Sequence, residues 1–181
     1  KKPLYKLCCG AFAASDQYKL KSFKGKCYKW GYFKEVKELK VDRFKPKKFE
    51  ESVSLMWCAR FIDWKHPEMA VKLAKRLKDN GYKFQLDMYG DGEMRPAIQK
   101  MVDGYGLDDC VCLKGNVPNE QIQEAMADHD IFLFTSDEEE GWGVVANEAI
   151  SNKCCLVGSD KIGAVPYLVK DGVNGMVFKS K

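Results

Sequence analysis

Residues 51–181 show two hydrophobic periods in turn, because short apolar runs alternate with stretches that have helical spacing. The apolar runs predict strands over 53–59, 84–89, 110–113, 131–134, 155–157 and 176–178. The stretches between them predict helices over 67–80, 92–102, 118–127, 143–151 and 165–169. Strands that alternate with helices in this way form a parallel sheet with helices on both faces. The pattern therefore predicts a doubly wound, Rossmann-like α/β fold.

Residues 1–50 do not follow this pattern. Their sequence predicts a helix over 4–14, an aromatic strand or loop over 28–33 and a charged connector over 34–48. This segment has too few apolar residues to make a core of its own. We therefore predict two parts, a basic linker with the remnant of a preceding domain over 1–50, and the main domain over 51–181.

The net charge of +4 hides a difference between these two parts. Residues 1–50 hold fifteen basic and five acidic side chains, whereas residues 51–181 hold fifteen basic and twenty-one acidic ones. A basic segment with interleaved aromatic residues is also typical of nucleic-acid binding, so this remains an alternative. The aromatic residues look more like half of an apolar core, and we expect no nucleic-acid partner.

Composition excludes several other classes of protein. A chain with 45% hydrophobic and 31% charged residues is expected to pack a core rather than remain disordered. Its apolar runs fall far short of the ~20 residues that span a bilayer, and no signal peptide is evident. The eight cysteines form no C-x-x-C pair and lie far from both histidines, which indicates reduced structural thiols and no metal site.

Ligands of an open parallel sheet bind at the carboxyl ends of its strands. Arg60 and Lys65 follow the first predicted strand, and together they could neutralise a diphosphate. Glu140 precedes a helix and Glu148 lies within it, where carboxylates could accept hydrogen bonds from ligand hydroxyls. The glycine-flanked helix start at 141–144 offers free N–H groups to an anion. Each signal alone is also typical of a solvated charge, an acidic helix start or a plain turn.

The order of these elements is more specific. The succession of Arg60 and Lys65, Gly90-Asp91-Gly92, Gly115-Asn116-Val117 and the segment Glu140-Gly-Trp-Gly-Val-Val-Ala-Asn-Glu148 resembles the second domain of family 4 (group 1) glycosyltransferases of the GT-B fold. The E-x7-E spacing from Glu140 to Glu148 is the family's most specific mark. The resemblance covers about residues 52–178, and it implies the C-terminal, donor-binding half of such an enzyme, truncated at both ends.

The resemblance also implies roles for individual residues. Arg60 and Lys65 would bind the donor's diphosphate and stabilise it as leaving group, Glu140 would hold the transferred sugar, and Glu148 the ribose. The other donor-binding residues that it implies are Gly141, Trp142, Gly143, Val144, Gly90, Asn116 and Val117. Catalysis would retain the anomeric configuration and need no metal, with a UDP- or GDP-sugar as co-substrate and no other cofactor.

The chain departs from the family pattern at several positions. Ala59 and His66 stand where the family commonly has glycine, and Tyr167 where many members have glutamate, which puts that contact in doubt. Trp142 replaces the usual phenylalanine, a conservative change. The acceptor-binding domain is missing apart from the remnant, so we expect weak donor binding and no transfer by this chain alone. The full enzyme is expected in the cytoplasm, or at the inner membrane face if its glycan acceptor is lipid-linked.

Two rival classes share this topology. A non-catalytic nucleotide- or phosphate-binding α/β module would bind the diphosphate with no preference for a sugar. A response-regulator receiver needs an acidic pocket at the end of the first strand, where this chain has Ala59 and Arg60. We therefore rank the receiver below the nucleotide-binding module.

Overall fold

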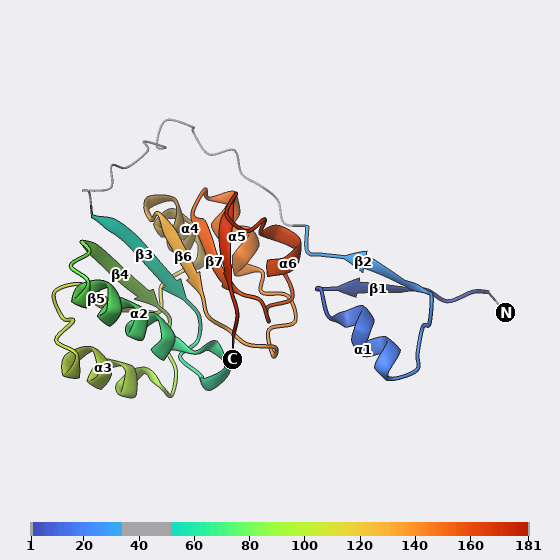
Figure 1. Cartoon of the computed structure of the whole chain (residues 1–181), viewed down its shortest axis with the longest axis horizontal. Helices are drawn as coiled ribbons and strands as arrows, with labels where there is room; N and C mark the ends of the chain where they lie inside the picture. The colour runs from blue at the N-terminus through green and yellow to red at the C-terminus, as the bar shows by residue number, and fades with distance from the viewer. Residues whose placement is uncertain (1, 34–51, 181) are drawn as a thin grey trace.

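The computed structural model describes residues 2–33 and 52–180, and its main part is one parallel sheet (Figure 1). Six strands lie in the order β5-β4-β3-β6-β7-β8. They are β3 (Val53–Cys58), β4 (Phe84–Tyr89), β5 (Val111–Gly115), β6 (Ile131–Phe134), β7 (Cys155–Ser159) and β8 (Gly175–Phe178). All neighbouring pairs are parallel, so all six carboxyl ends lie along one edge. The predicted doubly wound α/β fold is confirmed.

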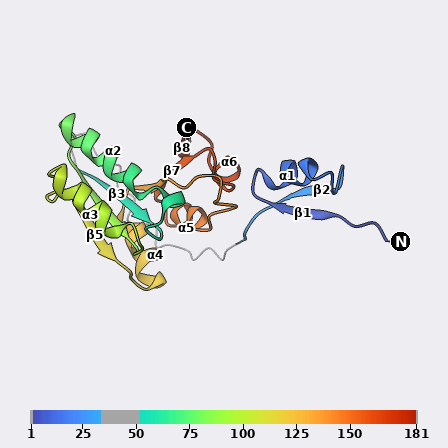
Figure 2. The same cartoon turned by 90° about the horizontal axis from the view of Figure 1, so that it is seen from below.

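Helices cover both faces of the sheet (Figure 2). On one face, α2 (Pro67–Asp79) and α3 (Arg95–Gly104) pack on a core that includes Trp57, Phe61 and Leu86. On the other, α4 (Asn119–Asp128), α5 (Val145–Ser151) and α6 (Val165–Leu168) pack on a core that includes Met56 and Phe132. Successive residues of a strand point to opposite faces, which explains why β3 supplies Trp57 to one core and Met56 to the other.

Most predicted elements agree with the structure within three residues, and α3 shows why one boundary moves. Its predicted start was residue 92, whereas the helix begins at Arg95. Gly90 and Gly92 have positive φ angles of 119° and 157°, and their backbone runs against Ala59 and Phe61. The N–H of Phe61 donates to the carbonyl of Asp91 (2.9 Å). The turn is thus held against the end of β3, and the helix starts only after it.

The N-terminal residues form a small separate sheet, which we call the N-terminal unit (residues 2–33). It consists of β1 (Lys6–Cys9), α1 (Ala13–Lys19) and β2 (Cys27–Trp30), and the two strands pair in parallel. The prediction of a helix over residues 4–14 was wrong, because residues 6–9 form the strand β1. The apolar run around Cys8 is short enough to suit either structure, and Gly10, with φ of +93°, ends the strand before α1 begins.

Of the other expectations for the N-terminal segment, the aromatic stretch over 28–33 contributes its first residues to β2. The charged connector predicted over 34–48 lies outside the described residues. Within the described ranges, no helix is long and apolar enough to cross a membrane.

Candidate functional site

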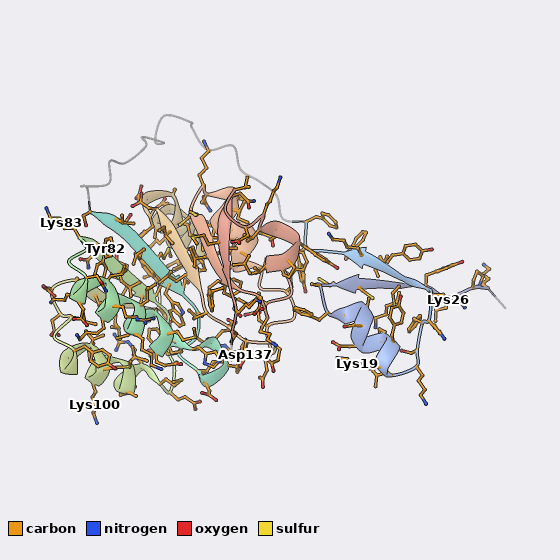
Figure 3. The ribbon with its side chains drawn as sticks, viewed as in Figure 1. Lys19, Lys26, Tyr82, Lys83, Lys100 and Asp137 are labelled. Atoms are coloured by element: carbon orange, nitrogen blue, oxygen red, sulfur yellow. The ribbon has the colours of Figure 1, made fainter. Side chains whose placement is uncertain are left out.

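The loops after β3 and β6 meet at the carboxyl edge of the sheet, where the order of the strands reverses. A short 3-10 helix, η2 (Asp63–Lys65), follows β3. The N–H of Asp137 donates to the carbonyl of Trp64 (3.1 Å), and the hydroxyl of Thr135 donates to the carbonyl of Lys65 (2.7 Å). Figure 3 shows Asp137 at this edge. Ligands of doubly wound sheets bind where the strand order reverses, so the topology favours this edge as the site.

The indole of Trp57 connects the loops after β3 and β6 to the core of the domain. Its Nε1–H donates to the hydroxyl of Thr135 (2.8 Å), and that hydroxyl in turn donates to the carbonyl of Lys65. Trp57 is buried in the core beneath α2. This chain of hydrogen bonds connects the core to η2, and it gives Lys65 a fixed backbone position.

The structure brings Lys65 and Glu140 together as an ion pair. Their side chains are only 13% and 14% exposed, and the hydroxyl of Ser136 also donates to the Glu140 carboxylate (3.4 Å). The Lys65 ammonium lies 3.9 Å from the centroid of the Trp64 ring, which adds a cation–π contact. A largely buried cation and carboxylate in contact can offer a ligand both a donor and an acceptor group.

Arg60 lies two residues after the end of β3 and is exposed. Its guanidinium carbon lies 6.0 Å from the centroid of the Trp64 ring, at the outer limit of a cation–π contact. The guanidinium therefore lies beside the same indole as the Lys65 ammonium, with its five donors available to an anion.

The loop of residues 140–144, which we call the 140–144 loop, has unused backbone donors. No hydrogen bond among the described residues uses the backbone N–H of Gly141, Trp142, Gly143 or Val144. Gly143 has φ of +83°, and a Cβ there would collide with the ring of Phe134. Successive backbone N–H groups in a turn with a positive-φ glycine can form an anion-binding concavity, so this loop is a candidate for binding an anion.

Glu148 lies behind this loop, on α5, and is 8% exposed. It faces Cys58 at the end of β3. Burial raises the pKa of the Cys58 thiol to about 12, and the negative charge of Glu148 adds to the shift. Glu148 is thus held at the boundary between the second core and the sheet edge, further inside than Glu140.

The remaining residues predicted for the site lie at the ends of β4 and β5. The N–H of Gly90 donates to the carbonyl of Gly115 (2.8 Å), which ties the two strand ends together. Asn116 is exposed, while Val117 packs on the second core. Gly90 packs closely against the backbone of Ala59, so a side chain there is excluded by packing alone.

His66 lies beside the candidate site as the N-cap residue of α2, in agreement with its interpretation from the sequence as a helix-entry residue. Its backbone adopts the left-handed conformation (φ +48°, ψ +53°), which explains why glycine suits this position in the family. The imidazole Nε2 lies 3.1 Å from the Asp137 carboxylate, and Nδ1 lies 3.4 Å from that of Glu68. Its departure from glycine was the available signal, and a glycine requirement indicates positive φ.

Tyr167 replaces an expected glutamate and serves a structural contact instead. Its hydroxyl donates to the carbonyl of Gly10 in the N-terminal unit (3.2 Å). The ammonium of Lys29 lies 3.7 Å from the centroid of its ring. Burial, chiefly, raises the pKa of the Tyr167 phenol above its ordinary value.

Comparison with known proteins places this arrangement in a family. The sequence profile described as "Glycosyl transferases group 1" matches residues 39–181. The amylovoran biosynthesis glycosyltransferase AmsK of Erwinia amylovora is 28% identical over 130 residues, which cover 69% of this chain and 32% of AmsK. The chain thus spans about a third of the length of that relative.

Solved structures share the fold. The lipopolysaccharide outer core galactosyltransferase WaaB, in its apo form, superposes with a TM-score of 0.80 at 19% identity, covering 97% of this chain and 48% of WaaB. The pneumococcal O-GlcNAc transferase GtfA, solved in complex with UDP and GlcNAc, gives a TM-score of 0.72 at 20% identity over 97% of this chain and 34% of GtfA. At these identities the likeness shows the fold, which is that of GT-B enzymes. The chain belongs to the group 1 glycosyltransferase family.

Proposed function

We propose that this chain is the donor-binding part of a retaining glycosyltransferase, which transfers a sugar from a nucleoside diphosphate to a glycan or lipid-linked acceptor. The observation that carries the proposal is the Lys65–Glu140 pair beside the unused N–H groups of the 140–144 loop. A diphosphate needs cations and N–H donors, and a sugar needs an acceptor for its hydroxyls. Both kinds of group lie together at the carboxyl edge of the sheet.

Each charged residue then has a role in the proposed reaction. Lys65 and Arg60 bind the diphosphate, and Glu140 accepts a hydrogen bond from a hydroxyl of the sugar. Glu148 holds the ribose. Since Glu148 lies further inside than Glu140, the donor would enter with its nucleoside first and leave its sugar at the mouth of the site. Asn116 and Val117 border the base, and Gly90 allows the strand ends to approach it closely.

In this proposal, the chemical step depends on positively charged groups and N–H donors that are already in position before the reaction. When the bond between the sugar and the diphosphate breaks, negative charge grows on the leaving diphosphate. The ammonium of Lys65, the guanidinium of Arg60 and the N–H groups from Gly141 to Val144 would stabilise that charge without reorganisation. We propose that these groups suffice without a metal ion. All of them serve the donor, so donor binding rather than sugar transfer is expected of this polypeptide on its own.

The N-terminal unit supports a proposal about domain organisation. It has two strands and the short helix α1, which buries none of its own residues, and aromatic side chains such as Tyr28 (54% exposed) and Phe33 (78% exposed) remain open to solvent. A two-stranded sheet does not bury enough apolar surface to be stable by itself. We propose that residues 1–50 are the linker and the end of an acceptor-binding domain, and that the enzyme works in the cytoplasm, at the inner membrane face when the acceptor is lipid-linked.

Isothermal titration calorimetry of this chain with UDP, GDP and ADP, and with UDP- and GDP-sugars, tests the proposal. We expect a uridine or guanosine diphosphate sugar to bind more tightly than the free diphosphate, because Glu140 contacts the sugar. Arg60→Ala should weaken binding roughly tenfold or more, the usual effect of losing a charge-assisted hydrogen bond. Lys78→Ala, which removes a cation that pairs with Asp109 on the exposed side of α2, is the matched control and should bind normally.

The same titrations separate the rival function. A non-catalytic nucleotide-binding module would bind the diphosphate and its sugar conjugate equally. Glu148→Gln separates the ribose contact from charge, because it keeps the shape of the side chain. Equal affinity of the wild type, Arg60→Ala and Glu148→Gln for every nucleotide would contradict the site assignment.

A further inference from the structure

The 140–144 loop is held on its outer side by the N-terminal unit. Trp142 is 6% exposed, although it belongs to a surface loop. The ring of Tyr32 lies 5.9 Å from the Trp142 ring between centroids, and the ring of Tyr167 lies at the same distance. The indole is therefore packed between the segment that follows β2 and α6, as well as against the second core.

Gly31 fits this packing because it has no side chain. A Cβ at Gly31 would lie 2.6 Å from Cη2 of Trp142, and its three nearest atoms would all belong to the benzene part of the indole. The backbone of Gly31 does not have positive φ, so the Trp142 ring alone excludes a side chain here. The presence of glycine at position 31 is thus explained by the indole in the loop.

Hydrogen bonds connect the same three segments. The indole Nε1–H of Trp142 donates to Oδ1 of Asn147 (2.7 Å), and Nδ2 of Asn147 donates to the carbonyl of Tyr32 (3.3 Å). The asparagine therefore bridges the indole to the end of β2, and it fixes both the tilt of the ring and the distance to the N-terminal unit.

A second contact lies at the end of β1. A Cβ at Gly10 or at Gly163 would collide with the carbonyl oxygen of Gly141. The N–H of Ala11 donates to the carbonyl of Gly163 (2.9 Å), and the N–H of Gly163 donates to the carbonyl of Glu140 (3.1 Å). The backbone that carries Glu140 is thus pinned, through Gly163, to the N-terminal unit.

We propose that Gly31 and Tyr32 are positioning residues for the donor site, acting through Trp142. They set where the indole lies, and the indole sets where the 140–144 loop holds Glu140 and its free N–H groups. This proposal extends the proposed function, and it depends on that function only in the experiment that measures nucleotide binding. The geometry of the donor site would then depend on how the N-terminal unit packs against the 140–144 loop.

The structure also indicates how the loop would respond to a change at position 31. A groove of about 430 Å³ lies beside Trp142, lined by Tyr32, Asn147, Tyr167 and other residues. Gly31 also lines this groove, and an alanine methyl at position 31 would require the indole or the segment after β2 to shift. The carbonyl of Trp142 accepts from the N–H of Ala164 (3.0 Å), so the displacement would strain that bond and the Gly163–Glu140 bond together.

The variants for the test are matched glycine substitutions. Gly31→Ala introduces the collision, and Gly104→Ala is the control, because a Cβ at Gly104 meets nothing within 4 Å and its φ is not positive. Trp142→Phe replaces the two-ring indole by a smaller single ring that does not reach as far as Cη2. The double variant Gly31→Ala/Trp142→Phe should therefore relieve the collision. Tyr32→Ala removes the packing ring without adding any atom, and it remains informative if Gly31→Ala does not fold.

The first measurement is amide hydrogen exchange in the chain without nucleotide. We expect the Gly163 and Ala164 amides to exchange roughly tenfold faster in Gly31→Ala and in Tyr32→Ala than in the wild type. Gly104→Ala should leave these rates unchanged. The double variant should resemble Trp142→Phe rather than show the sum of both effects. Unchanged exchange at Gly163 and Ala164 in both Gly31→Ala and Tyr32→Ala would overturn the proposal.

The second measurement is calorimetric binding of UDP and GDP to the same variants. Gly31→Ala should weaken the binding of whichever nucleotide the wild type binds by roughly fivefold to tenfold, with partial recovery in the double variant. Wild-type affinity in Gly31→Ala would overturn the positioning role. If the wild type binds neither nucleotide, the proposed function fails, and the exchange rates still decide whether Gly31 and Tyr32 position the loop.

Discussion

The Lys65–Glu140 pair allows a quantitative test of the site, through Lys65→Met. This change keeps the apolar stem of the side chain and removes its charge. The Glu140 carboxylate, 14% exposed, then retains only the Ser136 hydroxyl at 3.4 Å among the side-chain contacts described for it. Breaking a fully buried pair costs about 3–5 kcal/mol, and an exposed pair contributes about 0–1 kcal/mol. With both side chains seven-eighths buried, we expect a loss of about 2–4 kcal/mol.

Urea unfolding followed by circular dichroism measures this loss. A destabilisation of about 3 kcal/mol lowers the urea midpoint by about 1.5 M when the slope is about 2 kcal/mol/M. Lys65→Met/Glu140→Gln removes both charges, so it should lose about 2 kcal/mol less than the sum of the single variants. Lys19→Met breaks the exposed Lys19–Asp16 pair (3.0 Å; 77% and 55% exposed) and should leave the midpoint almost unchanged. Figure 3 labels Lys19 on α1.

Additive effects of Lys65→Met and Glu140→Gln would refute the reasoning, because independent residues do not form a pair. Nucleotide titration of the same variants adds a functional readout. Lys65→Met should bind UDP or GDP at least tenfold more weakly than the wild type, whereas Glu140→Gln should mainly lose the preference for the sugar conjugate. The same loss in both variants for the free diphosphate would contradict the separate roles of the two residues.

Further outcomes follow from the contacts around the site. Trp57→Phe removes the indole donor to Thr135 and should lower the free energy of unfolding by about 1–2 kcal/mol, measured in urea. His66→Gly should keep the backbone and donor binding, whereas His66→Val should cost about 1–3 kcal/mol, because a β-branched residue is strained at φ of +48°. Cys58, whose pKa of about 12 exceeds its ordinary 9.0, should react with iodoacetamide at pH 8 about a thousandfold more slowly than an ordinary exposed thiol, and exposed Cys155 should be labelled first in peptide mass spectra. Because the folded pKa of Cys58 is raised, its contribution to stability is complete below pH 9 and is lost as the pH rises toward 12, which urea midpoints above pH 9 can follow.

A different result would contradict each of these predictions. An unchanged urea midpoint in Trp57→Phe would mean that the hydrogen bond from the indole to Thr135 does not stabilise η2. Loss of nucleotide binding in His66→Gly would assign the imidazole a ligand contact that its present partners do not require. Labelling of Cys58 as fast as that of Cys155 would show that the Glu148 side of α5 opens to solvent.

The sheet could be predicted from the sequence because each strand and helix has its own hydrophobic period. Residues 131–134 are apolar on both sides of the strand, as β6 requires in the centre of a sheet covered on both faces. The helix predicted over 4–14 was wrong because its short apolar run fits either period. Its structure depends on pairing with β2, in which each partner residue, such as Cys27 for Lys6, lies twenty-one positions further along the chain, and local spacing does not reveal this.

The candidate site was predictable in part. Residues at the ends of β3 and β6 could be assigned to one edge of the sheet from topology alone, and the structure pairs Lys65 with Glu140 there. The contacts of His66, Tyr167 and Gly31 could not be predicted in this way. Each depends on a partner from a distant segment, and each partner is a backbone carbonyl, a ring or a carboxylate that could equally have faced solvent.

The crossing of Gly10, Gly141 and Gly163 bears on how sequence variation in this family should be interpreted. Three stretches of main chain touch there, and side chains at Gly10 and Gly163 are excluded by the Gly141 carbonyl oxygen whatever sugar or nucleotide is bound. Glycine at these two positions is therefore expected to persist across enzymes of different specificity. Invariance of Gly10 or Gly163 among homologues would record this crossing of backbones and would not mark a contact with substrate.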